Sequence, residues 1–390
     1  MNDKTRILVT CPKEVPPLLA GEIEALGLPV LSRETAGVMT EGTLEDCMRL
    51  NLCLRTGHRV HRLVRNFDAA DADALYQNIA AIPWEKHIRE DGYISIASSV
   101  RNDTIRDNRY ANLKCKDAIC DRMREACGRR PDSGSELRGV VIFLHWHGNR
   151  CSVYFDTSGE PLSRRGYRRM AVRAPMQETL AAAVVMTTGW NGQGHFVNPM
   201  CGSGTLAIEA ALIALGRAPG LLRREFAFMH LKDFKREKWE AVRAEIAKQG
   251  RGSPSGRIIA TDINPQAVAA ARQNAADAGV ESLIEFDVCD FAETRVPEGG
   301  GVVVFNPEYG ERTGETQALI PVYRRIGDFL KRSCRGYRGY VFTGNSKLFN
   351  KVSLKPSRQW TLFNSNIECR LLEYEVFGTR SGSGLETAST

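Results

Sequence analysis

The sequence predicts an α/β fold preceded by a smaller α+β region, and three observations carry this prediction. From about residue 175 onward, helix-like and strand-like segments alternate, which is typical of a parallel sheet covered by helices. Before that point, short apolar runs and helix-like segments are mixed without such a repeat. The composition, 43% hydrophobic and 25% charged, is that of an ordinary globular protein, and 390 residues allow two or three domains.

The first 160 residues predict two small α+β subdomains, at residues 1–65 and 66–160. In both, apolar runs such as ILV (residues 7–9) occur beside helix-like segments. A polar turn, HGN (residues 147–149), predicts that the last two strands form a hairpin. The expected helices span residues 15–26, 44–54 and 113–127, and the expected strands 93–97, 140–144 and 151–156.

Residues 161–380 predict a Rossmann-like domain. Asn264 is a good N-cap, with Pro265 at the first helical position and Gly279 just past the helix end. The expected helices span residues 176–188, 205–215, 266–277 and 318–330. The expected strands span residues 194–198, 257–262, 283–286, 302–305 and 340–343, followed by a hairpin of 360–363 and 369–377. We expect the tail, residues 381–390, to be disordered.

Several classes of protein are disfavoured by composition. No window approaches the about 18 uninterrupted apolar residues of a membrane span, and the apolar run ILVT (residues 7–10) is too short for a secretory signal. The eleven cysteines include no CxxC pair, and the closest, Cys115, Cys120 and Cys127, lie near helical spacing. We therefore predict reduced core thiols, no metal site and a cytoplasmic location.

The stretch FVNPMCGSGT (residues 196–205) predicts a strand that leads into a Gly-Ser-Gly turn and then a helix. Gly202 and Gly204 allow backbone N–H groups to approach a ligand at the electropositive start of that helix. The loop lacks the Gly-Lys-Ser/Thr ending of a Walker A loop. Tight turns between strand and helix can also be purely structural, so the loop by itself leaves both interpretations open.

Asp262 ends the next strand, where a carboxylate can accept both hydroxyls of a ribose. In dinucleotide-binding folds the matching acid lies about 20 residues after the glycines. Here 58 positions separate Gly204 from Asp262, with a charged helical insert at residues 231–248 between them. This spacing argues against a nicotinamide dehydrogenase, and it permits any nucleoside whose ribose lies at the second strand. A surface acid at the end of a strand is the structural alternative.

Asp290 follows the third strand, in FDVCDF (residues 286–291). It is positioned to meet an adenine edge, with Phe291 able to lie beside the ring. Aspartate is also common in turns for local reasons, so a structural role stays open for this residue.

The fourth strand ends in an unusual segment, VVVFNPEYGER (residues 302–312). Ligands of open α/β sheets bind outside the carboxyl ends of the strands, so this segment faces the same crevice as the glycines and the two acids. An exocyclic nucleobase amine is a poor nucleophile because its lone pair is delocalised into the ring. The Asn306 side-chain carbonyl and the Pro307 backbone carbonyl can accept its two hydrogens and favour an amine-like geometry, while Tyr309 can stack on an extruded base.

A basic stripe lies at residues 161–173 (PLSRRGYRRMAVR), with five arginines, no acid and an aromatic residue. The net charge of +7 gains meaning through this position, because arginine makes forked contacts with phosphate. A solvated linker is the alternative interpretation. The stripe residues that would contact the backbone of RNA or DNA are Arg164, Arg165, Tyr167, Arg168 and Arg169.

These motifs together resemble THUMP-domain ribosomal RNA guanine-N2 methyltransferases, in the large-subunit branch whose members are often described as N6-adenine-specific DNA methylases. The family's loop (Asp/Asn)-Pro-x-Cys-Gly-Ser-Gly-Thr is similar to residues 198–205, and its Asn-Pro-Pro-Tyr-Gly-Glu-Arg to residues 306–312. Further similar segments are FDTSGEPLSRRGYR (155–168), PMQETLAAA (175–183), RTGHRV (55–60) and IPW (82–84). The resemblance covers nearly the whole chain.

The resemblance implies an S-adenosylmethionine-dependent methyltransferase domain at 161–380, a ferredoxin-like subdomain at 1–65 and an RNA-gripping THUMP domain at 66–160. It implies large-subunit ribosomal RNA as the partner, with no membrane and no metal. The cofactor residues carried over are Asn198, Pro199, Cys201, Gly202, Ser203, Gly204, Thr205, Asp262 for the ribose and Asp290 for the adenine. Asn306, Pro307 and Tyr309 would hold the target base.

One position departs from the family pattern, because Glu308 stands where the second proline would fix φ. Both predicted acceptors, Asn306 and the Pro307 carbonyl, survive this change, and Glu308 is acceptable if it points to solvent or pairs with Arg312. We predict an active enzyme whose base clamp, the segment of residues 306–309 that would hold the target base, is less rigid. An adenine-N6 methyltransferase on DNA or RNA, and an RNA-binding ribosome-assembly factor without turnover, remain alternatives, and the oligomeric state is open.

Overall fold

The computed structural model describes residues 4–105, 107–168, 176–250, 252–310 and 313–376. Within them, the chain divides into two compact units. Unit 1 contains residues 4–168, 176–187 and 215–252, and unit 2 contains residues 188–214 and 253–376, apart from the gaps just given. The predicted disordered tail, residues 381–390, lies outside the described residues.

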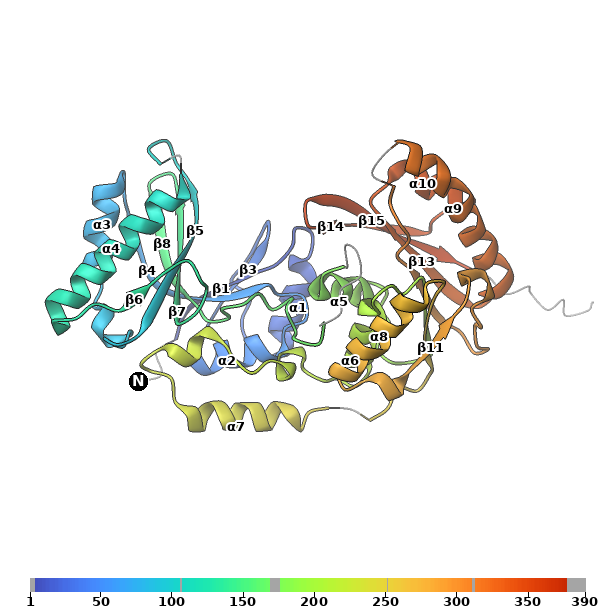
Figure 1. Cartoon of the computed structure of the whole chain (residues 1–390), viewed down its shortest axis with the longest axis horizontal. Helices are drawn as coiled ribbons and strands as arrows, with labels where there is room; N and C mark the ends of the chain where they lie inside the picture. The colour runs from blue at the N-terminus through green and yellow to red at the C-terminus, as the bar shows by residue number, and fades with distance from the viewer. Residues whose placement is uncertain (1–3, 106, 169–175, 251, 311–312, 377–390) are drawn as a thin grey trace, which may run out of the picture. The chain divides into compact units, whose positions relative to one another are not determined.

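Unit 1 is built on one eight-stranded sheet with the order β2-β3-β1-β4-β8-β7-β5-β6 (Figure 1). Strand β4 pairs antiparallel with β1 on one side and with β8 on the other. The two predicted amino-terminal subdomains therefore share one sheet through β4. Its strands are Thr5–Thr10 (β1), Ser32–Glu34 (β2), Gly37–Gly42 (β3), Arg59–Asp68 (β4), Tyr93–Arg101 (β5), Asp132–Ser133 (β6), Val140–His147 (β7) and Arg150–Asp156 (β8).

Capping side chains set where the helices of unit 1 begin. Thr43 and Asp46 form a capping box at the start of α2, with the Asp46 N–H donating to the Thr43 hydroxyl at 3.2 Å. Helix α4 begins before the predicted residue 113 because the Asp107 carboxylate accepts from the Arg109 N–H at 2.8 Å. The helices are Pro16–Ala25 (α1), Leu44–Cys53 (α2), Ala72–Ala80 (α3), Asn108–Cys127 (α4), Glu178–Thr187 (α5) and Arg236–Ala247 (α7), with 3-10 turns at Trp84–Lys86, Pro219–Leu222 and Ala227–His230.

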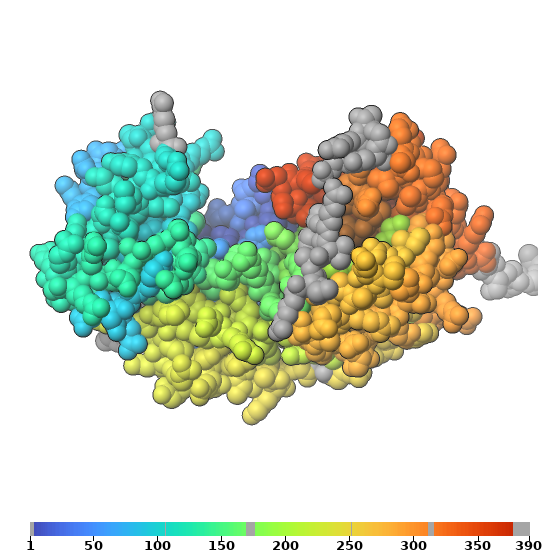
Figure 2. All heavy atoms as spheres, viewed as in Figure 1, coloured from blue at the N-terminus to red at the C-terminus, as the bar shows by residue number. Residues whose placement is uncertain are grey.

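The charged insert predicted at 231–248 forms α7, which lies at the surface of unit 1 in the yellow segment of Figure 2. Two ion pairs join it to α2: Arg49 with Glu245, at 2.7 Å, and Lys238 with Glu45. Gly220 precedes α7, and a Cβ atom there would lie 2.5 Å from the Asn51 carbonyl oxygen. The insert is therefore packed closely onto α2.

Unit 2 is a doubly wound sheet with the order β11-β10-β9-β12-β13-β15-β14. The first five strands in this order run parallel, and the β14–β15 hairpin adds the antiparallel edge. Because the chain winds outward from β9 in one direction and from β12 in the other, the carboxyl ends of these two strands flank a topological switch point. The strands are His195–Pro199 (β9), Ile258–Asp262 (β10), Ile284–Val288 (β11), Gly301–Phe305 (β12), Tyr337–Thr343 (β13), Arg358–Asn364 (β14) and Ile367–Glu375 (β15).

Alternate residues of the central strands bury opposite faces of this sheet. Val197, Val303 and Phe305 pack with α9 in one apolar core, whereas α6 and α8 contact each other and the β9–β10–β11 side. Strand residues at every second position share a face, so the apolar runs predicted for these strands supply both cores. The helices are Thr205–Ala214 (α6), Pro265–Asp277 (α8), Thr313–Ser333 (α9) and Ser346–Phe349 (α10), with 3-10 turns at Glu281–Leu283, Phe291–Glu293 and Asn350–Val352.

The predicted Rossmann-like arrangement and the terminal hairpin are confirmed by this topology. Strands β2 to β4 and helix α3 lie in stretches where the sequence predicted no boundaries. The boundaries of the three predicted domains stay a prediction. Within the described part of the chain, no helix is long and apolar enough to cross a membrane.

Candidate functional site

The glycine loop after β9 is held in shape by backbone bonds and left-handed residues. Met200 adopts φ of 67°, and the Cys201 N–H donates to the Thr261 carbonyl at 2.8 Å. Gly204 has φ of 82°, and a Cβ atom there would lie 2.8 Å from the Cβ of Ala271 in α8. Gly202 also has positive φ, at 54°, but a Cβ there would meet open space. Gly204 thus serves helix packing, whereas Gly202 leaves room for a ligand.

Asp262 connects this loop to the start of α8. Its Oδ2 accepts from the Gly202 N–H at 2.9 Å, and its Oδ1 accepts from the Asn264 N–H at 2.9 Å. A carboxylate offers about four acceptor positions, so each oxygen retains one for a ligand hydroxyl. The structure therefore gives the predicted ribose residue a second role, which is to fix the glycine loop.

Asn198 is completely buried at the end of β9, and it links β9 to β12. Its Nδ2 donates to the Val304 carbonyl at 2.9 Å, which leaves its Oδ1 as a buried acceptor without a partner among the described residues. An unsatisfied buried acceptor costs about 1–3 kcal/mol. This atom is therefore suited to a donor supplied by a ligand at the carboxyl ends of the strands.

The other predicted cofactor residues of the loop, Pro199, Cys201, Ser203 and Thr205, are buried. The Ser203 carbonyl accepts from the Asn274 side chain at 3.1 Å. Burial, with the nearby Asp262 charge adding to it, raises the pKa of the Cys201 thiol well above its ordinary value. Cys201 is thus a neutral thiol of the loop interior and not a nucleophile.

Asp290 caps the turn after β11 and forms an ion pair. Its Oδ1 accepts from the Ala292 N–H at 2.9 Å and from Arg325 at 2.6 Å. Burial disfavours the charged form, but the Ala292 bond and the Arg325 guanidinium outweigh it, so the pKa of Asp290 lies below its ordinary value. The expectation that Phe291 would lie beside an adenine ring is wrong, because Phe291 packs edge-on against Phe305 and Phe329 in the core.

Two apolar side chains that the sequence analysis missed are exposed at the same edge of the sheet. Ile263 is 69% exposed and Val288 is 47% exposed. They lie at the carboxyl ends of neighbouring strands, since Val288 pairs in register with Asp262. The sequence offered one signal, an isoleucine directly before the N-cap Asn264. Only the structure shows that its side chain is exposed.

The predicted base clamp begins at the end of β12. The Tyr309 hydroxyl donates to the Asn306 Oδ1 at 3.0 Å, and the Tyr309 ring packs edge-on against Phe342. Burial, then the nearby Cys369, raises the pKa of Tyr309 far above its ordinary value, so the hydroxyl stays protonated as a donor. Glu308 is exposed, as the prediction of an active clamp requires, and Arg312 lies outside the described residues.

The predicted RNA-binding stripe is only partly a surface. Arg165 and Tyr167 are each 1% exposed, and Arg165 donates to the carbonyls of Leu54, Leu162 and Arg55. Their prediction as RNA contacts is wrong, because side chains buried in this way cannot reach a phosphate. The Arg165 guanidinium instead ties its own segment to the distant residues Leu54 and Arg55.

The remaining stripe residues differ among themselves. Arg168 pairs with the buried Glu178 and donates to the Met176 carbonyl at 3.0 Å. Arg164 is exposed and pairs with Glu160 at 2.6 Å. Arg169 lies outside the described residues. Among the stripe residues that the structure describes, Arg164 is therefore the arginine left available to a nucleic acid.

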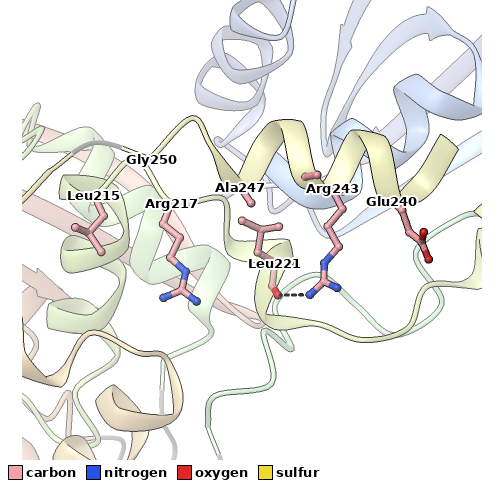
Figure 3. Close-up of a pocket in the computed structure, with 8 residues that line it drawn as sticks. Leu215, Arg217, Leu221, Glu240, Arg243, Ala247 and Gly250 are labelled. Atoms are coloured by element: carbon pink, nitrogen blue, oxygen red, sulfur yellow. Dashed lines mark hydrogen bonds between the residues drawn. The ribbon is translucent and has the colours of Figure 1, made fainter. Parts of the chain in front are cut away.

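Two hollows contain none of the predicted site residues. One, of about 630 Å³, belongs to unit 1, and in Figure 3 the Arg243 side chain reaches the Leu221 carbonyl at its edge. It is lined by Leu215, Arg217, Leu221, Glu240, Arg243, Ala244, Ala247 and Gly250. The other, of about 570 Å³, lies in unit 2 beside the amino-terminal ends of β9, β12 and β13, with Arg338 in its lining. That is the sheet edge opposite to the glycine loop and the clamp.

The described part of the chain has no cluster of metal-ligating side chains. There, no three side chains of His, Cys, Asp or Glu gather as metal ligands. The eleven cysteines carry free thiols.

Known families match the chain along its length. Residues 6–61 match the RlmL ferredoxin-like domain, residues 69–156 the THUMP domain, and residues 165–373 the RMKL-like methyltransferase domain. The last match covers more than half of the chain. The chain belongs to the RMKL-like methyltransferase family. The resemblance to THUMP-domain ribosomal RNA methyltransferases and the predicted fold class are confirmed.

Curated relatives of this RMKL-like chain carry the name ribosomal RNA large subunit methyltransferase K/L. The protein of Syntrophotalea carbinolica is 37% identical over 387 residues, and that of Methylococcus capsulatus 35% over 384 residues. These alignments cover 96% of this chain but 54% and 52% of the relatives. The chain thus spans about half the length of the curated relatives it matches.

Solved structures agree with the RMKL-like assignment. A predicted N6-adenine-specific DNA methylase from Listeria monocytogenes is 30% identical with a TM-score of 0.87, covering 96% of this chain and 97% of that one. SMU.472, a provisionally assigned methyltransferase solved with S-adenosylhomocysteine (SAH), is 25% identical with a TM-score of 0.88 and covers 97% of this chain and 100% of that one.

Proposed function

We propose that this chain is an S-adenosylmethionine-dependent methyltransferase acting on an exocyclic nucleobase amine, with guanine-N2 in large-subunit ribosomal RNA as its target. The observation that best supports this is the meeting of four features at the carboxyl ends of β9 to β12. These are the glycine loop, Asp262, Asp290 and the Asn306–Pro307–x–Tyr309 segment. Ligands of doubly wound sheets bind at this edge.

The side chains at this edge fit the cofactor. The buried Asn198 Oδ1 has no partner among the described residues, and the ammonium group of the methionine moiety would supply one. Asp262 would accept from the ribose hydroxyls with the acceptor positions left beside its bonds to Gly202 and Asn264. Ile263 and Val288 would cover the adenine faces, with Asp290 at its edge. When bound, S-adenosylmethionine supplies an electrophilic methyl group.

The clamp residues prepare the amine that accepts this methyl group. The Asn306 Oδ1 and the Pro307 carbonyl would each accept one hydrogen of the exocyclic amine, which turns its lone pair out of conjugation. The Asn306 Oδ1 already accepts from the Tyr309 hydroxyl at 3.0 Å, and an amide oxygen can accept a second hydrogen bond, so the amine would bind beside that hydroxyl. Neither Asn306 nor Pro307 is a base, so the amine proton would leave to water or to an RNA phosphate.

RNA as the substrate is supported by the amino-terminal half. The THUMP match covers residues 69–156, and the curated relatives are named for large-subunit ribosomal RNA. The net charge of +7 favours a polyanionic partner. This substrate implies a cytoplasmic enzyme.

Adenine-N6 methylation is the second candidate, because the Listeria relative is named as an N6-adenine-specific DNA methylase. An Asn-Pro-x-Tyr clamp can hold either amine, since both present two hydrogens on one nitrogen. The product nucleoside therefore decides between them.

The test is transfer of labelled methyl from S-adenosylmethionine to unmodified large-subunit ribosomal RNA, with the product nucleoside identified. We expect N2-methylguanine, and a loss of about 100- to 1000-fold in kcat for Asn306→Ala, comparable to removal of an oxyanion-hole donor. N6-methyladenine would keep the mechanism and overturn the substrate. Absence of transfer by the unmodified protein, with transfer by Glu308→Pro, would identify a binding protein with a disabled site.

A further inference from the structure

We propose that Tyr323 and Asn345 are positioning residues of the base clamp, which hold its backbone where the family pattern would use a second proline. This inference rests on the proposed methyl transfer, because it concerns the same site. It starts from the carbonyl groups of residues 307–310, which follow Asn306 in the clamp. Three of the four are bound by side chains from α9 and from the segment after β13.

Tyr323 is completely buried in α9, and its hydroxyl donates to the Glu308 carbonyl at 3.1 Å. The same hydroxyl lies 2.7 Å from the Thr343 hydroxyl, which accepts from the Asn345 N–H at 3.2 Å. Since Tyr323 spends its one proton on Glu308, Thr343 has to donate to Tyr323. The donors therefore run in one direction, from Asn345 through Thr343 and Tyr323 to the Glu308 carbonyl, and such chains strengthen their members.

Asn345 binds the next carbonyls directly. Its Nδ2 donates to the Tyr309 carbonyl at 2.8 Å and lies 3.4 Å from that of Gly310, while the Thr316 hydroxyl donates to the Gly310 carbonyl at 3.1 Å. The Asn345 Oδ1 caps α10 by accepting from the Lys347 N–H at 3.0 Å. One asparagine thus ties the clamp to the first turn of α10.

The fourth carbonyl of this segment, that of Pro307, is the one that the proposed reaction uses. Among the described residues, the Pro307 carbonyl receives no hydrogen bond, whereas those of Glu308, Tyr309 and Gly310 do. A proline at 308 would restrict φ of that residue. With Glu308 in its place, the bonds from Tyr323 and Asn345 supply the restriction from outside the loop.

The decisive experiment is a double-mutant cycle of Tyr323→Phe and Glu308→Pro. Phenylalanine keeps the ring packing of Tyr323 and removes only the donor. Glu308 is exposed, and its N–H makes no hydrogen bond to the described residues, so proline removes no bond there. We expect Tyr323→Phe to lower kcat for methyl transfer about five- to tenfold, without changing KM for S-adenosylmethionine, and to lower it less than about twofold in the Glu308→Pro background.

Tyr374→Phe is the matched control. Tyr374 is 1% exposed in the same apolar core, and its hydroxyl has no partner among the described residues. Its removal should leave kcat unchanged. Asn345→Ser keeps a capping hydroxyl for α10 but is too short to reach the Tyr309 carbonyl, so it should reproduce the Tyr323→Phe loss.

Hydrogen exchange of the peptide covering residues 343–348 reads the positioning without any turnover, because the Asn345 and Lys347 N–H groups donate to Thr343 and to the Asn345 Oδ1 in this network. Exchange should be faster in Tyr323→Phe than in the unmodified protein, and unchanged in Tyr374→Phe. Equal exchange in all three, or an equal kcat loss with and without Glu308→Pro, would overturn the inference. No methyl transfer by the unmodified protein, with the expected exchange pattern, would instead overturn the proposed function and remove the catalytic role from this inference.

Discussion

The two halves of the candidate site in unit 2 differ in how complete they are without a ligand. The cofactor half, built from the glycine loop and Asp262, has its backbone bonds made, and the buried Asn198 Oδ1 has no partner among the described residues. The clamp half has its reactive acceptor, the Asn306 Oδ1, occupied by Tyr309. The cofactor would therefore meet an acceptor that has no partner among the described residues, whereas the target base would share the Asn306 Oδ1 with the Tyr309 hydroxyl.

This difference follows from the chemistry of the two ligands. A cofactor of fixed structure can be met by a fixed acceptor, and preorganisation lowers the cost of binding it. The target base has to leave its stack in the RNA before it reaches the clamp. Until it arrives, the hydrogen bond from Tyr309 to Asn306 keeps both of these polar groups satisfied. This difference between the two halves can be tested by changing one residue in each of them.

The largest effect is expected from Asp262→Ala in the cofactor half. The substitution removes an acceptor from the Gly202 N–H and from the proposed ribose at once, so affinity for S-adenosylhomocysteine should fall about 10- to 100-fold in titration calorimetry. Asp287→Ala is the control, because Asp287 is an exposed carboxylate on the neighbouring strand β11. An unchanged affinity in Asp262→Ala would contradict the ribose assignment. It would also contradict the proposal that the cofactor half is already arranged for its ligand.

A smaller effect of opposite sign is expected from Tyr309→Phe in the clamp half. The phenylalanine ring can still stack on a base, but it no longer competes for the Asn306 Oδ1. We expect kcat/KM for RNA to rise about two- to fivefold while the affinity for S-adenosylhomocysteine stays constant. A fall as large as that of Asn306→Ala would show that the hydroxyl takes part in the reaction. The bond from Tyr309 to the Asn306 Oδ1 would then help the clamp and not compete with the base.

The sequence predicted more of the cofactor half than of the clamp's support. Glycines, strand-end acids and Asn-Pro form contiguous motifs whose chemistry follows from residue type, and the alternation of elements predicts the shared sheet edge. Tyr323 and Asn345 lie 17 and 39 positions beyond Asn306, and nothing local marks a buried tyrosine as a donor to a loop. Such roles depend on long-range packing.

For the basic stripe, the sequence analysis predicted surface residues that the structure buries. Arg165 and Tyr167 have the composition of a nucleic-acid surface, yet they are buried, and the Arg165 guanidinium donates to the carbonyls of Leu162 and Arg55. Burial is decided by tertiary contacts, and a charge run reports only residue type.

The smallest effect is expected from Asp290→Asn, in the one residue of the cofactor half whose carboxylate is already paired. Asparagine can still accept from the Ala292 N–H, so the substitution mainly removes the ion pair with Arg325, whose side chain is 50% exposed. Unfolding in urea at pH 7 should show a loss of about 0.5–1 kcal/mol. Arg325→Gln should show the same loss without any change in affinity for S-adenosylhomocysteine, whereas Asp290→Asn should also weaken that affinity if Asp290 meets the adenine.

The pH dependence of this loss follows from the lowered pKa of Asp290. A carboxyl whose pKa is lower in the folded state than in the unfolded state stabilises the fold fully above the unfolded value of about 3.9, and less as the pH falls through the folded value. The difference in the free energy of unfolding between the unmodified protein and Asp290→Asn should therefore be constant from pH 8 to about pH 5 and shrink in stronger acid. A difference that persists undiminished in acid would show that the ion pair with Arg325 is not the interaction that Asp290→Asn removes.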